Sequence, residues 1–131
     1  MQLKLITPDR VVVDESNVVS VSALAVDGSV GIMANHAPFV TPLDIGIVTY
    51  KHENGQKTAL AVMAGMLQTD GKTVTIISTA AEKSTEVDAL RAEEAKKRAE
   101  LLMEQSDDAK KQLEAEMALK RSLTRLKVSS R

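Results

Sequence analysis

The chain has 131 residues, 44% of them hydrophobic, and a formal net charge of −1. This length allows one domain or two small ones, and the near-neutral charge argues against general nucleic-acid binding. The sequence has no cysteine, which excludes disulfides, thiolate metal sites and a thiol nucleophile. No segment has the length and apolarity of a membrane span or a signal peptide, so we expect a soluble, cytoplasmic protein.

Residues 1–84 are predicted to form a small antiparallel β domain, because turn signals recur about every ten residues, as in sandwiches and barrels. The expected strands cover residues 3–6, 10–13, 18–26, 45–51, 57–63 and 72–78. Segment 30–43 contains Pro38 and Pro42, which cannot donate to a central ladder, so we expect an edge strand and a loop there. With one Phe, one Tyr and no Trp, the core must be aliphatic.

Residues 85–131 are predicted to form two helices, because from residue 87 onward the chain has no Gly or Pro and is rich in Ala, Leu, Glu, Lys and Arg. Ser84 and Thr85 are expected to cap the first helix, with Glu86 and Asp88 supplying negative charge to its first turn. Cap residues at 106–108 divide the region into helices 88–105 and 107 to about 128, which should form an antiparallel hairpin.

The hairpin has two apolar stripes that differ in size. The first consists of Ala92, Ala95, Ala99, Leu102 and Met103, and the second of Ala115, Leu119, Leu123 and Leu126. Alanine buries little area, so the first stripe contributes little stability. We therefore predict that the hairpin is held weakly and is a moving part.

Enzyme motifs do not fit this sequence. The glycines are scattered among turns and none opens a phosphate loop. His36 and His52 lie in different loops without a third ligand at metal spacing. We therefore expect no catalytic residue and no metal site.

Four arginines in the helical part have spacings that place them in pairs on one helical face: Arg91 with Arg98 and Arg121 with Arg125. An antiparallel hairpin would bring both pairs to one end, facing a cleft with Glu82 and Asp88 at its rim. Guanidinium groups bind phosphate oxygens bidentately, and a carboxylate accepts from a nucleoside amino or hydroxyl group, so the cluster suits a nucleoside polyphosphate.

The alternative is that these charges form ordinary exposed pairs along each helix, Glu94 with Arg98 and Glu116 with Lys120. The last fifteen residues, 117–131, carry five cations and no acid. This run indicates an acidic partner or a bound anion, or else cations that simply suit the negative end of the helix dipole.

Taken together, the sequence resembles the epsilon subunit of the bacterial F-type ATP synthase over its whole length. The resemblance is carried by Thr7-Pro8-Asp9, Gly28-Ser29-Val30-Gly31-Ile32, His36-Ala37-Pro38, Thr41-Pro42-Leu43, Ala80-Ala81-Glu82, Val87-Asp88-Ala89-Leu90-Arg91-Ala92 and Ala118-Leu119-Lys120-Arg121. It implies an N-terminal β-sandwich of about ten strands and a C-terminal two-helix hairpin.

The resemblance implies a non-catalytic subunit of the rotary central stalk of a proton-translocating ATP synthase. The sandwich would bind the gamma subunit and stand on the c-ring, with Ser29 and His36 as candidate contacts. The hairpin would either fold onto the sandwich or extend into the alpha/beta hexamer and block hydrolysis. There Lys120, Arg121, Arg125 and Lys127 would meet an acidic segment of beta. The subunit would lie on the cytoplasmic face of the bacterial membrane, touching it only through the complex.

Some members of that family bind ATP on the folded hairpin through a sequence motif of consecutive residues. The motif reads Ile or Leu, then Asp, two variable residues, Arg and Ala. Here Val87 replaces the Ile or Leu and the rest is intact. By position, the resemblance implies an ATP site made of Glu82, Val87, Asp88, Arg91, Arg98, Arg121 and Arg125. ATP would be a regulatory ligand, and no metal is required.

Three segments depart from the family pattern. Ser29 stands where many members have Glu, and Ala34-Asn35 where Pro-Gly is usual; both lie in the part that would face the c-ring. Ala64-Gly65-Met66 replaces Gly-Gly-Phe at a site that would face gamma. Two alternatives stay open: the same subunit without nucleotide binding, and a sandwich-and-hairpin adaptor for another acidic partner.

Overall fold

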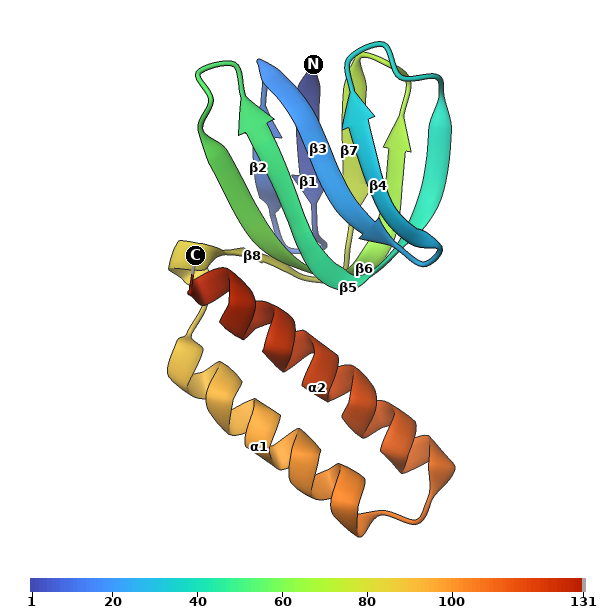
Figure 1. The fold of residues 1–131 in the computed structure, drawn as a ribbon, viewed down its shortest axis with the longest axis vertical. Coiled ribbons are helices and arrows are strands. Elements are labelled where there is room, and N and C mark those ends of the chain that lie inside the picture. The colour runs from blue at the N-terminus through green and yellow to red at the C-terminus, as the bar shows by residue number, and fades with distance from the viewer. Residues whose placement is uncertain (131) are drawn as a thin grey trace.

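The computed structural model describes residues 1–130, in which a β-sandwich is followed by a two-helix hairpin (Figure 1). The expected fold class is therefore confirmed. The elements are β1 (Gln2–Ile6), β2 (Val11–Glu15), β3 (Val18–Ala25), β4 (Gly28–Met33), β5 (Phe39–His52), β6 (Lys57–Thr69), β7 (Thr73–Ile77), β8 (Ala81–Lys83), the 3-10 helix η1 (Ser84–Glu86), α1 (Ala89–Gln105) and α2 (Ala109–Ser129).

The strands follow the order β2-β1-β7-β6-β5-β3-β4, and β8 pairs with β6. Neighbouring strands are antiparallel except β1 and β7, which are parallel. The expectation of a purely antiparallel sandwich was wrong for this one pair. A short hairpin forces two consecutive strands to be antiparallel, but β1 and β7 are far apart in the sequence and no turn fixes their relative direction.

Two long strands, β5 and β6, connect the layers of the sandwich, and they pair along most of their lengths. The other edge of β6 pairs with β8 at Leu60 to Val62 and with β7 at Met66 to Thr69. The chain changes partner at Ala64 and Gly65, both of which have positive φ. Segments expected to be separate strands are thus continuous, and the described residues form eight strands rather than about ten.

Segment 30–43 was predicted to be an edge strand and a loop, which is correct for β4 and wrong for residues 39–43. These residues begin β5, and Pro42 lies opposite Met66 of β6. On the other side of β5, the pairing with β3 is irregular between Ser22 and Ala25. In a strand the N–H and C=O of one residue point to the same side, and the carbonyl of Pro42 accepts from the N–H of Val26 at 3.2 Å. The donor that proline lacks would therefore face β3, where the pairing is already irregular.

The sandwich core is aliphatic, as composition predicted, with Tyr50 as its single aromatic residue. Tyr50 is 2% exposed, and its hydroxyl donates to Glu15 at 3.2 Å. Burial raises the pKa of Tyr50. The core is complete within the strands, so the sandwich is a platform on which the hairpin lies.

The helices begin at Asp residues, because Asp88 caps α1 by accepting from the N–H of Arg91 and Asp108 caps α2 by accepting from that of Lys110. The predicted break at 106–108 is confirmed. The prediction that Ser84 and Thr85 cap the first helix was wrong. Those residues belong to the 3-10 helix η1. A hydrogen bond from the N–H of Lys83 to the carboxylate of Glu86, at 2.9 Å, stabilises this turn.

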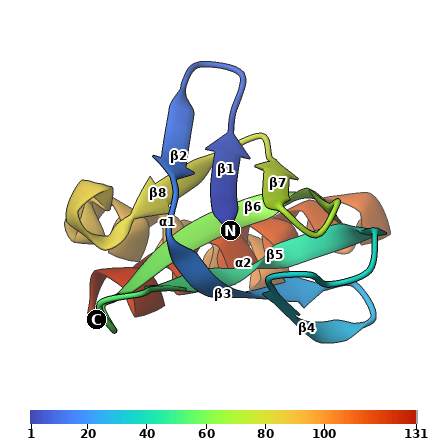
Figure 2. The same cartoon turned by 90° about the horizontal axis from the view of Figure 1, so that it is seen from above.

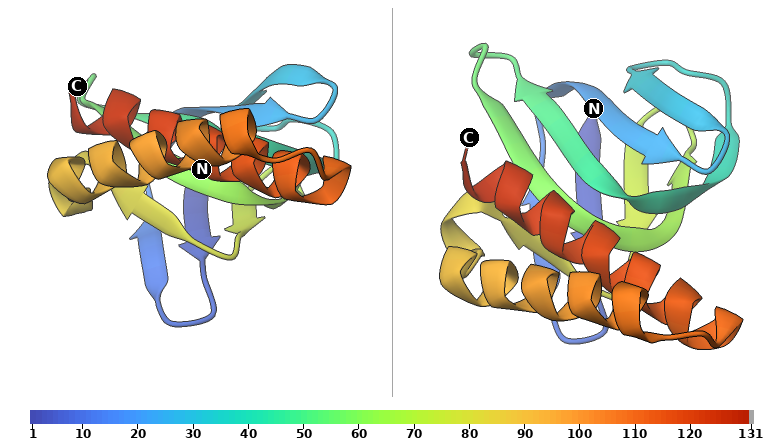
Figure 3. Two further views of the ribbon diagram at one scale, coloured as in Figure 1. Left: turned by 90° about the horizontal axis from the view of Figure 1, so that it is seen from below. Right: turned by 60° about the horizontal axis from the view of Figure 1, so that its bottom comes forward.

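Helix α2 lies between α1 and the sandwich (Figures 1 and 3). Seen from above, both helices lie on the far side of the sandwich, beyond β5 and β6 (Figure 2). The predicted Leu stripe of α2 is therefore only partly correct, and Leu123 is 40% exposed. Because α2 packs against both α1 and the sandwich, small residues lie where its backbone comes closest to these neighbours. The buried hydroxyls of Ser122 and Thr124 donate to carbonyls one turn earlier.

We predict that Gly65→Ala destabilises the sandwich by about 2 to 4 kcal/mol. Gly65 has a φ of +140°, and an added Cβ would lie 2.0 Å from the backbone oxygen of Ile77. Urea unfolding gives the free energy. Gly31→Ala is the matched control, since its Cβ would meet no atom within 4 Å, and it should cost less than about 0.5 kcal/mol. Equal effects of the two substitutions would contradict the close approach.

Candidate functional site

A pocket of about 420 Å³ lies where the hairpin joins the sandwich. It is lined by Glu82, Glu86, Asp88, Arg91, Ala92, Ala95, Arg98 and Arg125. These residues come from β8, η1, the N-cap and first ten residues of α1, and the last third of α2. The pocket therefore exists only while α2 is docked beside β8.

Local sequence explains how α1 lines the pocket. Arg91 and Arg98 are seven residues apart, close to two helical turns, so both side chains start from one face. Ala92 and Ala95 lie between them and leave open volume because their side chains are single methyl groups. The Asp88 cap fixes the start of the helix and leaves a carboxylate at the pocket rim.

The pocket lining carries three carboxylates and three guanidinium groups. Glu82 accepts from Nε of Arg125, with both oxygens at 3.2 Å. Glu86 accepts a hydrogen bond from the guanidinium group of Arg10, and this bond holds the pKa of Glu86 below its ordinary value. Within residues 1–130, Arg91 and Arg98 form no ion pair. These two cations are available to an anion.

Of the seven residues expected in the nucleotide site, five line the pocket: Glu82, Asp88, Arg91, Arg98 and Arg125. The other two are elsewhere. Val87 packs against the apolar cluster under the end of α2, and Arg121 is a half-buried residue one turn before Arg125. Thus three of the four expected arginines converge on the cleft.

The alternative of simple pairs along each helix finds little support. Among the described residues, neither Glu94 with Arg98 nor Glu116 with Lys120 forms an ion pair. The only such pair along a helix in that range is Lys96 with Glu93, at 3.9 Å.

Sequence reasoning missed three residues at or behind this site: Glu86, Ala95 and Arg10. Glu86 was assigned only to the helix start and Ala95 only to the apolar stripe, although Ala95 lies one turn after Arg91 and its position indicates the lining. Ala92 was included as the last residue of the family motif. Arg10 gave no signal at all, because its contact with Glu86 spans 76 residues.

Two family models match the chain. The model described as "ATP synthase, Delta/Epsilon chain, beta-sandwich domain" matches residues 1–84, and "ATP synthase, Delta/Epsilon chain, long alpha-helix domain" matches residues 85–130. The chain belongs to the ATP synthase delta/epsilon chain family. The resemblance noted in the sequence is confirmed, and this family assignment makes the chain a non-catalytic subunit of an ATP synthase.

Individual relatives agree with the family assignment. The chain is 40% identical over 131 residues to the ATP synthase epsilon chain of Bacillus pumilus, covering 100% of this chain and 98% of that one. It is 37% identical over 129 residues to that of Symbiobacterium thermophilum, covering 98% and 92%. A chain in the Euglena gracilis mitochondrial ATP synthase structure matches at a TM-score of 0.84 with 24% identity, covering 98% and 80%. That structural likeness supports the fold.

The hairpin of this delta/epsilon-family chain docks through a small contact, which we call the docking contact. Val128 of α2 is fully buried against Ile45, Ala61 and Met63 on the outer face of the sheet. Lys120 reaches Asp44 at 2.9 Å, and Arg125 reaches Glu82. Two cations of the basic run are therefore used by the sandwich in the docked state.

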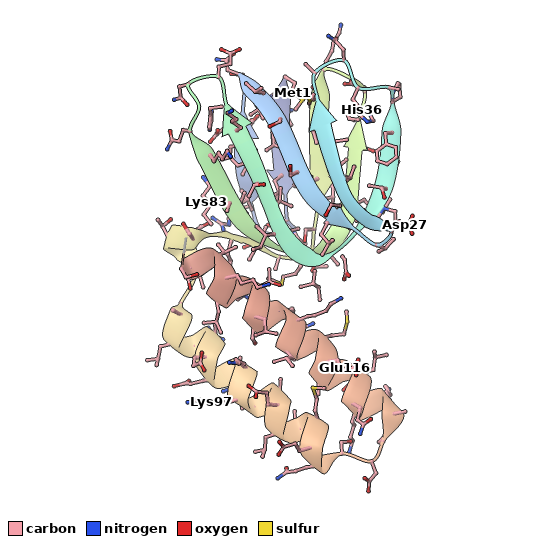
Figure 4. All side chains as sticks on the ribbon, viewed as in Figure 1. Met1, Asp27, His36, Lys83, Lys97 and Glu116 are labelled. Carbon is pink, nitrogen blue, oxygen red and sulfur yellow. The ribbon has the colours of Figure 1, made fainter. Side chains whose placement is uncertain are left out.

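The remaining expected partner residues lie elsewhere on the molecule. Ser29 is exposed in β4, and Lys127 is exposed in the last turn of α2. His36 lies at the end of the sandwich opposite the hairpin (Figure 4). Its Nδ1 is 2.7 Å from the carbonyl oxygen of Ala37, and its ring lies 5.6 Å from that of Phe39. Neither described helix has the length and apolarity needed to cross a membrane.

We predict that Asp44→Asn weakens docking at neutral pH and has no effect in acid. The hydrogen bond from Lys120 holds the pKa of Asp44 below its ordinary value of 3.8. A carboxyl with a lowered pKa stabilises the docked state above its ordinary pKa, and this contribution is lost as the pH falls through the docked-state value. Hydrogen-exchange protection factors of α2, corrected for intrinsic rates, measure docking across pH.

Asp27→Asn is the control for this substitution, because Asp27 is exposed in the turn between β3 and β4. It should leave the protection of α2 unchanged at every pH. A wild-type chain and an Asp44→Asn variant with identical protection at neutral pH would show that this ion pair contributes nothing to docking.

Proposed function

We propose that this chain is the epsilon subunit of a rotary ATP synthase central stalk and that its hairpin inhibits ATP hydrolysis unless ATP holds it against the sandwich. The observation that carries the proposal is the pocket at the hairpin junction, where Arg91 and Arg98 face Arg125. The family assignment supports the subunit identity, and the pocket supports the ligand.

The pocket has the size and chemistry for a nucleotide. Its volume of about 420 Å³ falls in the range of small-molecule sites. Arg91 and Arg98 would bind phosphate oxygens bidentately. A carboxylate such as Asp88 would accept from a nucleoside amino or hydroxyl group, and the two alanines leave room for the ring.

The energies allow ATP to control the hairpin. Burying a valine such as Val128 stabilises by about 1.5 to 3 kcal/mol, and a surface ion pair adds about 0 to 1 kcal/mol. A ligand that binds only the docked state at 100 times its Kd adds about 2.7 kcal/mol. Docking also buries Ile45, Ala61 and Met63 on the sheet, so the ligand term is one part of a larger docking energy and would decide which state prevails where partner surfaces balance the rest.

Release would expose the cations that docking uses. Lys120 and Arg125 would exchange Asp44 and Glu82 for an acidic segment of the catalytic beta subunit, joined by Arg121 and Lys127. The sandwich would bind gamma, and the end that carries His36 would stand on the c-ring. Ser29, two residues after Asp27 and paired with Leu24, lies toward the other end of β4 (Figure 4). The subunit would then work at the cytoplasmic face of a bacterial membrane without entering it.

A second candidate is the same subunit with a hairpin moved only by the gamma and beta surfaces. One observation favours it: the pocket lining is formally neutral, and Arg125 is already bonded to Glu82. A polyphosphate would then gain less than from a purely cationic cleft. Titration of the isolated chain with ATP separates the two candidates.

We predict that the chain binds ATP more tightly than ADP and that Arg98→Ala weakens ATP binding by about 10 to 100 times, because a hydrogen bond to a charged group is worth roughly 1.5 to 3 kcal/mol. Arg91→Ala should act similarly. Isothermal titration calorimetry measures both. Lys97→Ala is the matched control, an exposed cation next in sequence that is outside the pocket lining. Absence of ATP binding by the unmodified chain would remove the nucleotide from the proposal.

We also predict that Lys127→Ala weakens the inhibition of ATP hydrolysis in the assembled complex without changing ATP binding to the isolated chain. Lys127 is exposed in the docked state and lies outside the pocket lining, so its loss leaves the nucleotide site intact, whereas in the released hairpin its charge would meet the acidic partner. Lys111→Ala, an exposed cation of α2 outside the basic run, is the control. Equal hydrolysis rates for wild type and Lys127→Ala would argue against this contact.

A further inference from the structure

Behind the pocket, the turn between β1 and β2 is tied to the hairpin junction by Arg10. Its Nη1 donates to one carboxylate oxygen of Glu86, and its Nη2 donates to the carbonyl of Ala81 at 3.3 Å. The other oxygen of Glu86 accepts from the N–H of Lys83 at 2.9 Å. Arg10 therefore joins β8 and η1 immediately before the chain enters α1.

This contact changes the charge that an anion in the pocket would meet. The lining carries as many carboxylates as guanidinium groups, and Glu86 is one of those carboxylates. Arg10 is not part of the lining, but it neutralises Glu86 from outside. With Arg10 in place, the cations around the pocket outnumber the acids by one. The hydrogen bond between the two raises the pKa of Arg10 and lowers that of Glu86, so both remain charged.

We propose that Arg10 is a positioning residue for the nucleotide, which holds and neutralises Glu86 so that the pocket accepts a polyphosphate. This inference rests on the proposed ATP site. Without Arg10, the freed carboxylate of Glu86 would face the phosphates or turn toward Arg91 and compete with them. Because the repulsion grows with ligand charge, ATP binding suffers more than ADP binding.

A purely structural brace would behave differently. In that case Arg10 would matter only for the shape of η1, and losing Glu86 would be as harmful as losing Arg10. If charge is what matters, Glu86→Gln removes the need for Arg10. Glutamine keeps a carbonyl oxygen that can accept from the N–H of Lys83, so the local turn is retained.

The experiment is calorimetric titration of the full chain with ATP and with ADP. The variants are Arg10→Ala, Glu86→Gln, the two combined, and Lys72→Ala as a control on an exposed turn lysine. Arg10→Ala should weaken ATP binding about tenfold and ADP binding less. The combined variant should return to within about twofold of wild type, and Lys72→Ala should match wild type. Arg10→Gln, which is also neutral, serves if Arg10→Ala does not fold.

The outcomes separate this inference from the proposed function. If the wild-type chain binds ATP and Arg10→Ala binds it equally tightly, the role of Arg10 is overturned but the proposed ATP site is retained. A combined variant as weak as Arg10→Ala alone has the same consequence, because it would assign Arg10 to shape and not to charge. A wild-type chain that binds no ATP overturns both proposals.

Discussion

The docking contact between the end of α2 and the outer face of the sandwich determines the rest of this structure. It consists of an apolar cluster, in which Val128 packs against Ile45, Ala61 and Met63, and of two partly exposed ion pairs, Lys120 with Asp44 and Arg125 with Glu82. Burial of apolar side chains on both sides is worth several kcal/mol, and the exposed ion pairs add little. A contact of that size would let a ligand and a partner surface together shift the hairpin between two states.

Arg125 links docking to the pocket, because it bonds Glu82 and lines the cleft at the same time. Any anion that draws on Arg125 therefore acts on a group that also holds α2 to β8. Arg91 and Arg98 belong to α1 alone and follow α2 when it moves. In the proposed ATP-bound state, coupling between the ligand and the position of the hairpin would pass through the side chain of Arg125 and the helix that carries it.

The sandwich supplies the surface on which the hairpin docks. Its aliphatic core is closed without the helices, and β5 and β6 continue from one layer into the other. The bend at Ala64 and Gly65 lies directly after Met63, which contacts the end of α2. Ala64 has a φ of +61°, in the left-handed region that favours glycine. The bend therefore places Met63 at the docking surface.

The sequence alone determined the features that local chemistry controls: the change from strands to helices, the break at 106–108, the aliphatic core, and the shared face of Arg91 and Arg98. Only the tertiary structure decided which residues meet across the chain. The exposure of Leu123, the continuity of Pro42 with β5, and the contacts of Arg10 with Glu86 and of Lys120 with Asp44 all depend on packing. Helical period and capping act within a few residues, whereas a side-chain contact spanning 76 residues has no local signal and exists only once the chain has folded.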